Sequence, residues 1–339
     1  MSTDASPDPA PVLELLDAFR CSKVLFTAVA LGIFDRLEEE EATLPELAAS
    51  AKADPDALER LLDACVYLKL LTRKGAKYGN TPGASAYLCG KSPRRITGYL
   101  NYSNAILWKM WEHLEDAVRE GTHRWPQTFG SDGPIFSHFF RNEADKREFL
   151  LGMHGQGQVS SPEVARAFDL SRFKKLVDLG GATGHLAVAA CRRNPQLRAI
   201  VFDLPTAVPL AKEMIADSEV ADRVEVIAGD FFTDPLPEAD LFAVGRILHD
   251  WSEDKIQRLL AKIYERLPKG GALLVCEKLL NDDRSGPRWA VLQSLNMLVC
   301  TEGKERTLAE YETLLKAAGF AQVEGRRTNS PLDAVLAVK

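Results

Sequence analysis

The chain has 339 residues, 46% of them hydrophobic, and a formal net charge of −6. This length predicts two domains with a sizeable core. The acidic balance argues against a broad surface for nucleic acid or anionic membranes, because phosphate binding needs a positive field. The apolar runs fall short of the roughly 18 residues that a membrane span needs. Six scattered cysteines without a CxxC pair, and a start without the signal-peptide pattern, predict reduced thiols and a cytoplasmic protein.

The N-terminal part of the chain is helix-rich by its pattern. Residues 1–11 are polar and proline-rich, which predicts a disordered leader. Across residues 12–100, apolar side chains recur at helical spacing, and further helices begin at Thr43 and Asp54, where a capping residue precedes a proline. Two short strands around Gly75 then predict a hairpin. Helices followed by a hairpin are the outline of a winged helix.

Residues 101–170 are aromatic-rich and mostly helical by their pattern, and residues 171–339 have a different rhythm. Helical segments separate most of a series of short apolar runs, which predicts a parallel sheet covered on both faces, an α/β fold. The last two runs, AQVEGRRT and AVLAVK, lie too close together for a helix between them, so they predict an edge hairpin. The runs of buried-strand type are LVDLGG, AIVFDLP, VEVIAGDFF, LFAVGRIL and ALLVCEKLL.

A glycine-rich turn follows the first predicted strand. Gly180, Gly181 and Gly184 stand between this strand and a helix, where glycine lets a ligand approach the backbone and the helix start offers free amides. Asp178 lies inside the strand end, where a buried acid needs partners. The turn is compatible with NAD, FAD or S-adenosylmethionine, and also with a tight turn that binds nothing. It lacks the GxGxxG spacing that a pyrophosphate requires.

Acidic residues also follow the next two predicted strands. Asp203, with Leu204 after it, ends the second strand, where an acid can accept both hydroxyls of a ribose. Asp230 and Phe231 follow the third strand and suit the amino group and the ring of an adenine. Each acid alone is equally a strand-end cap. Together with the glycine turn they predict a nucleoside cofactor along the strand ends, and S-adenosylmethionine fits because it has no phosphate.

The fourth strand ends at His249, on the edge of the sheet where ligands bind in open parallel sheets. An imidazole suits proton removal near neutral pH, although a structural histidine is the alternative. Glu277, after the fifth strand, and Glu305 are candidates to hold its other nitrogen, and Glu305 could equally cap the next helix. His154 is the rival base. No His, Cys and Asp cluster has metal-ligand spacing, which predicts a site without metal.

Several longer motifs resemble those of the S-adenosylmethionine-dependent small-molecule O-methyltransferases. Among these the likeness is greatest to the acetylserotonin (hydroxyindole) O-methyltransferases and their methyltransferase-like relatives, and it covers nearly the whole chain. The motifs are GDFF, DPLPEADL, RILHDW, GGALLVCEKLL, SLNMLV and TEGKERT. The resemblance implies a Rossmann-like class I methyltransferase domain over 171–339, a winged-helix-like dimerisation domain over 12–100, an acceptor-pocket region over 101–170, and a homodimer.

The resemblance also implies roles for single residues. His249 matches the general base, and Glu277 and Glu305 match the acids that flank it. The resemblance implies an acceptor that is a hydroxyindole such as N-acetylserotonin or a related phenol. The departure is Cys300, where the acetylserotonin enzymes are expected to have a glutamine that helps to bind the substrate amide, and this favours a related phenol over N-acetylserotonin. The expected cofactor-binding residues are Asp178, Gly180, Gly181, Asp203, Leu204, Asp230, Phe231 and Arg246. The expected acceptor-binding residues are Met153, Asp250, Asn296, Met297 and Cys300.

Three other functions are compatible with parts of the sequence. A winged-helix regulator would need a basic recognition helix, but residues 54–66 carry Arg60 among four acids. An NAD-dependent oxidoreductase would be expected to have the GxGxxG turn. A methyltransferase-like protein that binds the cofactor with little catalysis stays open, although the chain keeps His249, Glu277 and Glu305.

Overall fold

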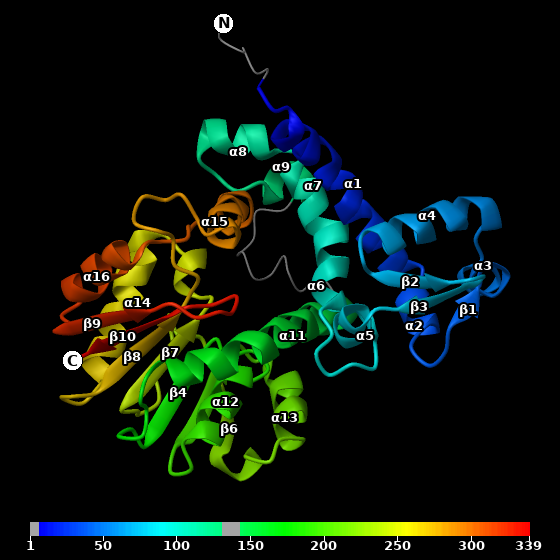
Figure 1. The fold of residues 1–339 in the computed structure, drawn as a ribbon. Coiled ribbons are helices and arrows are strands. Elements are labelled where there is room, and N and C mark those ends of the chain that lie inside the picture. The colour runs from blue at the N-terminus through cyan, green and yellow to red at the C-terminus, as the bar shows by residue number, and fades with distance from the viewer. Residues whose placement is uncertain (1–6, 131–142) are drawn as a thin grey trace, which may run out of the picture. The chain divides into compact units, whose positions relative to one another are not determined.

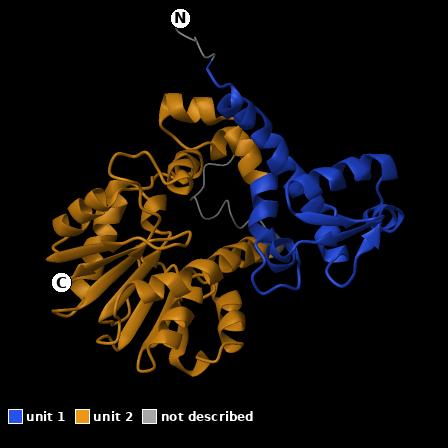
Figure 2. Cartoon of the chain, viewed as in Figure 1, with its two compact units in different colours: residues 1–105 blue, residues 106–339 orange. Residues whose placement is uncertain are grey.

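The structure is a computed structural model that describes residues 7–130 and 143–339. The chain divides into two compact units, residues 1–105 and residues 106–339 (Figure 2). In the described part of the chain, no helix combines the length and the apolarity that crossing a membrane would take.

The first unit contains helices and a small antiparallel sheet with strand order β1-β3-β2 (Figure 1). Helix α1 begins at Ala10, so the last two residues of the expected leader are helical. The two helix starts read from the sequence are capped as expected: Thr43 forms a capping box with Glu46, and Asp54 accepts a hydrogen bond from the amide of Ala57. The elements are α1 (Ala10–Ala30), α2 (Ile33–Arg36), β1 (Ala42–Thr43), α3 (Leu44–Ala51), α4 (Pro55–Tyr67), β2 (Leu71–Lys74), β3 (Lys77–Asn80), α5 (Pro82–Leu88) and α6 (Thr97–Tyr102).

The second unit is built on a seven-stranded sheet with strand order β6-β5-β4-β7-β8-β10-β9. Strands β4 to β8 are parallel, and β10 runs antiparallel to both β8 and β9, which confirms the predicted edge hairpin. The chain order reverses between β4 and β7, which is the switch point where open sheets bind ligands. The strands are β4 (Lys175–Leu179), β5 (Arg198–Asp203), β6 (Val224–Ala228), β7 (Leu241–Gly245), β8 (Ala272–Cys276), β9 (Gln322–Arg326) and β10 (Ala334–Val338).

Helices cover both faces of this sheet, as the alternation of strands and helices predicts. Successive residues of β4 belong to opposite cores, since Leu176 packs in one cluster with α12 and Val177 in another with α14 and α16. The helices are α7 (Trp108–Trp111), α8 (Leu114–Glu120), α9 (Trp125–Phe129), α11 (Glu143–Ala167), α12 (His185–Arg193), α13 (Val208–Ala216), α14 (Glu253–Arg266), α15 (Arg288–Cys300) and α16 (Leu308–Ala317), and a 3-10 turn, η3, covers Leu248–Asp250.

Candidate active site

The glycine turn after β4 is packed so closely that it has no room for side chains. Gly180 has φ of +66°, and a Cβ on it would lie 2.5 Å from Cδ1 of Ile247. A Cβ on Gly181 would lie 2.7 Å from Oδ2 of Asp178. Larger residues would therefore displace either the turn or the side chains against it, and the backbone of the turn stays open to a ligand.

Asp178 lies beneath this turn with an unsatisfied carboxyl oxygen. The side chain is buried, and its Oδ2 makes no hydrogen bond with the described residues. Burial, followed by the nearby charge of Asp203, raises the pKa of Asp178 to about 7. A buried oxygen without a donor is costly, so this end of the turn favours a ligand that donates hydrogen bonds or carries positive charge.

The acids at the next strand ends shape the backbone around the turn. Asp203 accepts hydrogen bonds from the amides of Ala182 and Leu204, both at 2.7 Å. Burial raises the pKa of Asp203, and each carboxylate oxygen keeps a second lone pair for a ligand hydroxyl. Asp230 accepts from the amide of Phe232 at 2.8 Å. The roles of Asp203, Leu204 and Asp230 in holding a nucleoside stay predictions.

Phe231 follows β6 and Arg246 follows β7, both at strand ends near the glycine turn or His249. The ring of Phe231 reaches the glycine turn, since its Cε1 would be 3.5 Å from a Cβ on Gly180. Arg246 follows β7 with φ of +55°, a left-handed conformation that costs energy for a residue with a side chain. Its amide donates to the carbonyl of Cys276 at 3.1 Å, which fixes the start of the segment leading to His249.

His249 lies in η3 just beyond β7, buried among three carboxylates. Its Nδ1 is 2.7 Å from Oε1 of Glu305 and 3.2 Å from Oε2 of Glu277, and its Nε2 is 3.7 Å from Oδ1 of Asp250. All four side chains are buried. The two acids proposed from the sequence therefore meet the same ring nitrogen, and Asp250 is the carboxylate nearest to the other one, Nε2.

Burial and the charges of this cluster shift the pKa values of its members. Burial by itself lowers the pKa of His249, but the carboxylates of Glu277, Glu305 and Asp250 outweigh it and raise the pKa to about 10. Burial raises the pKa of Glu277 to about 7 and that of Asp250 to about 6. Once an imidazolium forms here, the carboxylates stabilise it strongly.

Backbone contacts hold the two glutamates in place. Oε1 of Glu277 accepts from the amides of Ile247 and Leu248, each at 3.0 Å, so the residues just before His249 are tied to the end of β8. Gly303 packs on the carbonyl of His249, where a Cβ would overlap it. Helix α16 is capped by Thr307 and Glu310. Glu305 is therefore not the helix cap that its sequence position also allowed.

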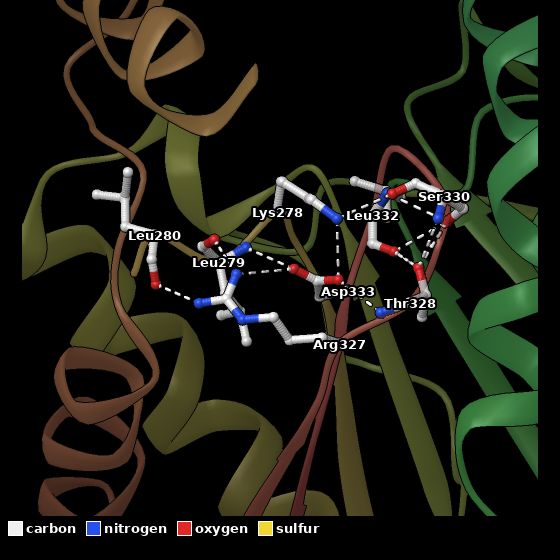
Figure 3. A network of polar contacts seen from close by, with 8 residues as sticks. All are labelled: Lys278, Leu279, Leu280, Arg327, Thr328, Ser330, Leu332 and Asp333. Carbon is white, nitrogen blue, oxygen red and sulfur yellow. Dashed lines mark hydrogen bonds and ion pairs between the residues drawn. The ribbon is translucent and has the colours of Figure 1, made fainter. Parts of the chain in front are cut away.

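Figure 3 shows a polar network immediately after Glu277, centred on Asp333 at the start of β10. Asp333 is fully buried, and its carboxylate contacts Nζ of Lys278 at 3.0 Å and accepts from the amides of Leu279 and Thr328 at 3.1 and 2.8 Å. Its own amide donates to the carbonyl of Glu277 at 2.9 Å. The network thus fixes the backbone from which Glu277 reaches His249.

Replacing Asp333 by alanine should destabilise the second unit by about 3 kcal/mol or more, because Lys278 and two amides lose a buried partner. Urea unfolding followed by tryptophan fluorescence measures this effect. The control is Glu238→Ala, which removes an exposed carboxylate whose distance to Arg266 is 3.4 Å. Equal midpoints for the two variants would show that the network contributes nothing.

Helix α15 brings the expected acceptor residues into one region. Asn296, Met297 and Cys300 are buried there. Oδ1 of Asn296 accepts from Nε1 of Trp111 at 2.9 Å and from Sγ of Cys300 at 3.7 Å. Two donors on Oδ1 leave the Nδ2 group of Asn296 as its free end, a hydrogen-bond donor. Met153 lies half-buried in α11, and contact of these residues with an acceptor stays a prediction.

The rival base, His154, has both ring nitrogens occupied. Nδ1 is 2.9 Å from Oγ1 of Thr183 in the glycine turn, and Nε2 is 2.9 Å from Nε2 of Gln158. Burial lowers its pKa. His185 similarly pairs with Ser161 at 2.8 Å. These histidines join α11 to the glycine turn and to α12.

In the described part of the second unit, three side chains lie close enough together to hold a metal ion, although their spacing in the sequence is not that of metal ligands. Ligand atoms of His249, Glu277 and Glu305 lie within 4.8 Å of one another, close enough for a metal ion. The residues are 28 and 56 positions from His249 in the chain, so no local spacing signals them. The Nδ1 to Glu305 distance has hydrogen-bond length, and the expectation of a metal-free site stays a prediction.

Three supporting residues were missed in the sequence. They are Trp111, which holds Asn296; Asp333, which holds Glu277; and Arg306, a buried arginine next to Glu305. Arg306 belongs to the TEGKERT motif, in which the sequence predicts a role only for Glu305. No local signal marks these roles of Trp111 and Asp333, because Asn296 lies 185 residues from Trp111 and Glu277 lies 56 residues from Asp333.

Comparison with known proteins shows the family of the chain. A family model described as the O-methyltransferase domain matches residues 111–321, and one described as the O-methyltransferase dimerisation domain matches residues 13–90. Acetylserotonin O-methyltransferases from Gallus gallus and Bos taurus are 42% and 44% identical, over 100% and 96% of this chain and 99% and 96% of theirs. The crystal structure of human N-acetylserotonin methyltransferase in complex with SAM is 40% identical, with a TM-score of 0.93 over 100% of this chain and 99% of that one. The chain belongs to the O-methyltransferase family.

Proposed function

We propose that the chain transfers a methyl group from S-adenosylmethionine to a hydroxyl of a small aromatic acceptor, a hydroxyindole such as N-acetylserotonin or a related phenol. The observation that carries the proposal is His249, buried at the strand ends with one ring nitrogen held by Glu305 and Glu277. The names of the acetylserotonin relatives support a hydroxyindole acceptor.

The crevice beside β4 suits S-adenosylmethionine by its donor and acceptor set. The glycine turn leaves its backbone open, and Asp178 offers a buried oxygen without a donor to a positively charged group. Asp203 would hold ribose hydroxyls, and Asp230 with Phe231 would hold the adenine. S-adenosylmethionine supplies a methyl group on a positively charged sulfur, which an oxygen nucleophile can attack.

In the proposed reaction, Nε2 of His249 accepts the proton of the acceptor hydroxyl, and S-adenosylmethionine would supply the methyl group to that oxygen and leave as S-adenosylhomocysteine. Glu305 and Glu277 fix the ring through Nδ1 and stabilise the imidazolium that forms. The Nδ2 group of Asn296 is a donor for an oxygen of the acceptor, because its Oδ1 is already used. Much of the rate comes from holding oxygen and methyl in line.

The orientation of the Cys300 thiol affects which acceptor the site can bind. The thiol is buried and directed at Asn296, so position 300 supports the amide of Asn296 and supplies no amide of its own. A thiol is a weak hydrogen-bonding group. This supports a phenol or hydroxyindole that needs no amide contact at position 300.

The proposal is tested with a panel of hydroxyindoles and simple phenols and labelled S-adenosylmethionine, each with and without EDTA. We expect label on the hydroxyl oxygen of at least one aromatic acceptor and the same rate with chelator present. No transfer to any hydroxyl, together with measured binding of S-adenosylmethionine, would instead support a cofactor-binding protein without this activity. Loss of activity with EDTA, restored by a metal, would contradict the metal-free site.

We further propose that the chain is a homodimer formed through the first unit. The dimerisation-domain match begins at residue 13. Helix α1 leaves an apolar surface exposed to solvent, and exposed apolar patches mark interfaces. Its members are Val12, Leu13, Leu15, Leu16 and Phe19, each more than half exposed.

Glutamates at Leu16 and Phe19 together should raise the dimer dissociation constant by about 100-fold or more, because charges replace apolar contacts in a buried interface. Sedimentation velocity at several protein concentrations measures it. Lys316→Glu, on the exposed side of α16, makes the same change in net charge and should leave the dimer intact. A dimer of unchanged strength in the double variant would place the interface elsewhere.

A further inference from the structure

Arg306 is a buried arginine that connects the two segments carrying the base and its partner acid. Only 1% of its surface is exposed. Its guanidinium donates to the carbonyl of Leu248 at 3.3 Å and to that of Lys304 at 3.1 Å. These carbonyls belong to the residues directly before His249 and Glu305. One nitrogen, Nη1, therefore bridges the two backbone segments that carry His249 and Glu305, the pair joined by the 2.7 Å hydrogen bond.

Backbone contacts with Leu280 hold the segment around Arg306 in place, independently of the Arg306 side chain. The amide of Leu280 donates to the carbonyl of Arg306 at 2.9 Å, and Leu280 forms a bridge with Thr307. Thr307 then starts α16 through its capping box with Glu310. The guanidinium hydrogen-bonds to the carbonyls of Leu248 and Lys304, so these bonds act within the site.

The charge of Arg306 also belongs to the buried cluster. An arginine is rarely buried without a partner, and its nearest acid, Glu253, is 4.0 Å away and exposed. Tyr311, fully buried on α16, reports on the surroundings: burial and then the charges of Glu277 and Glu305 raise the pKa of its hydroxyl, whereas Arg306 lowers it. Arg306 thus places a positive charge among these acids.

We propose that Arg306 is a positioning residue for His249: its guanidinium fixes the spacing between the base and Glu305, and its charge opposes protonation of the imidazole. The groups that face His249 are the carboxylates of Glu277, Glu305 and Asp250, which favour the imidazolium. Arg306 is bonded to the carbonyls next to His249 and Glu305, and Tyr311 is close enough to sense the charges of Glu277, Glu305 and Arg306. A nearby positive charge lowers the pKa of the His249 imidazole. A lower pKa helps the ring to release its proton after each reaction.

This inference rests on the proposed function but can be tested apart from it. The direct measurement is an NMR pH titration of the His249 ring in the protein without substrates, for the wild type, Arg306→Met and Arg306→Lys. We expect Arg306→Met to raise the pKa of His249 by about half a unit or more. Arg306→Lys keeps the charge and should leave this pKa near the wild-type value.

Kinetics then separate the charge from the geometry. In Arg306→Met, kcat should fall by about 10²-fold at neutral pH, since a misplaced catalytic group costs that much, and the rise of kcat/KM with pH should move to higher pH. In Arg306→Lys, the pH of this rise should stay and kcat should fall, because the flexible lysine stem does not hold its ammonium at the position that Nη1 occupies between the two carbonyls. Binding of S-adenosylmethionine should change little in both.

The matched control is Arg223→Met, which removes another guanidinium that donates to carbonyls, those of Cys191, Asn194, Pro195 and Leu197. It should lower stability without moving the His249 pKa. A folded Arg306→Met protein with the wild-type pKa and kcat overturns the proposal. If Arg306→Met does not fold, Arg306→Lys decides, and an unchanged kcat in that variant overturns it. Absent methyl transfer in the wild type refutes the proposed function, while the titration still tests Arg306.

Discussion

Replacing His249 by glutamine should lower methyl transfer by about 10²-fold or more while leaving the binding of S-adenosylmethionine near the wild-type value. The reason is that glutamine keeps a polar side chain of similar length but cannot accept a proton in the reaction. The loss should appear in kcat, because the interaction is made while the proton is transferred. Isothermal titration with S-adenosylmethionine and initial rates with the best acceptor measure the two quantities separately.

The matched control for this substitution is His154→Gln, which replaces the other buried histidine considered as a base. Both nitrogens of His154 are already bonded within the protein, so its replacement should affect the glycine turn and hence KM for the cofactor more than kcat. Full turnover in His249→Gln would refute the base assignment. A loss of kcat confined to His154→Gln would move the base to α11.

Replacing Glu277 by glutamine should shift the pH dependence of the reaction to lower pH. The base is the neutral imidazole, so kcat/KM rises with pH as His249 loses its proton. Burial by itself lowers the pKa of His249, but Glu277, Glu305 and Asp250 raise it to about 10. In the wild type we therefore expect the rate to keep rising well above pH 7. Removing one carboxylate should lower this pKa by roughly one unit or more.

The maximal rate should fall at the same time, because the imidazolium formed in the reaction loses part of its stabilisation. Glutamine can still accept from the amides of Ile247 and Leu248 through its carbonyl oxygen, so the fold around η3 is kept. Rates measured between pH 6 and 10 for wild type and variant, with Glu302→Gln as the control at an acid bonded to Lys255, check the shift. A profile that stays in place or moves to higher pH would contradict the electrostatic role of Glu277.

The sequence shows best the features that depend on neighbouring residues. Apolar runs of strand length are set by burial on both faces of the sheet, and β4 to β8 lie where those runs occur. Capping residues act within one helical turn, so the starts of α3 and α4 could be read directly. The glycine turn and the placement of His249 at a strand end follow from the same local rules. The helical start at Ala10 was missed because a proline-rich leader carries little pattern.

By itself, then, the sequence determined the α/β architecture, the glycine turn and the position of His249 at a strand end. Only the tertiary structure decided which acids reach this histidine: Glu305 was equally a helix cap until the loop before α16 brought it to 2.7 Å from Nδ1. It also decided that His154 is fully bonded and that Arg306 is buried beside the base. The physical reason is the distance along the chain between interacting residues. Residues that are close in sequence determine the local backbone conformation and the pattern of burial, whereas contacts between side chains far apart in sequence depend on how the loops close over the sheet.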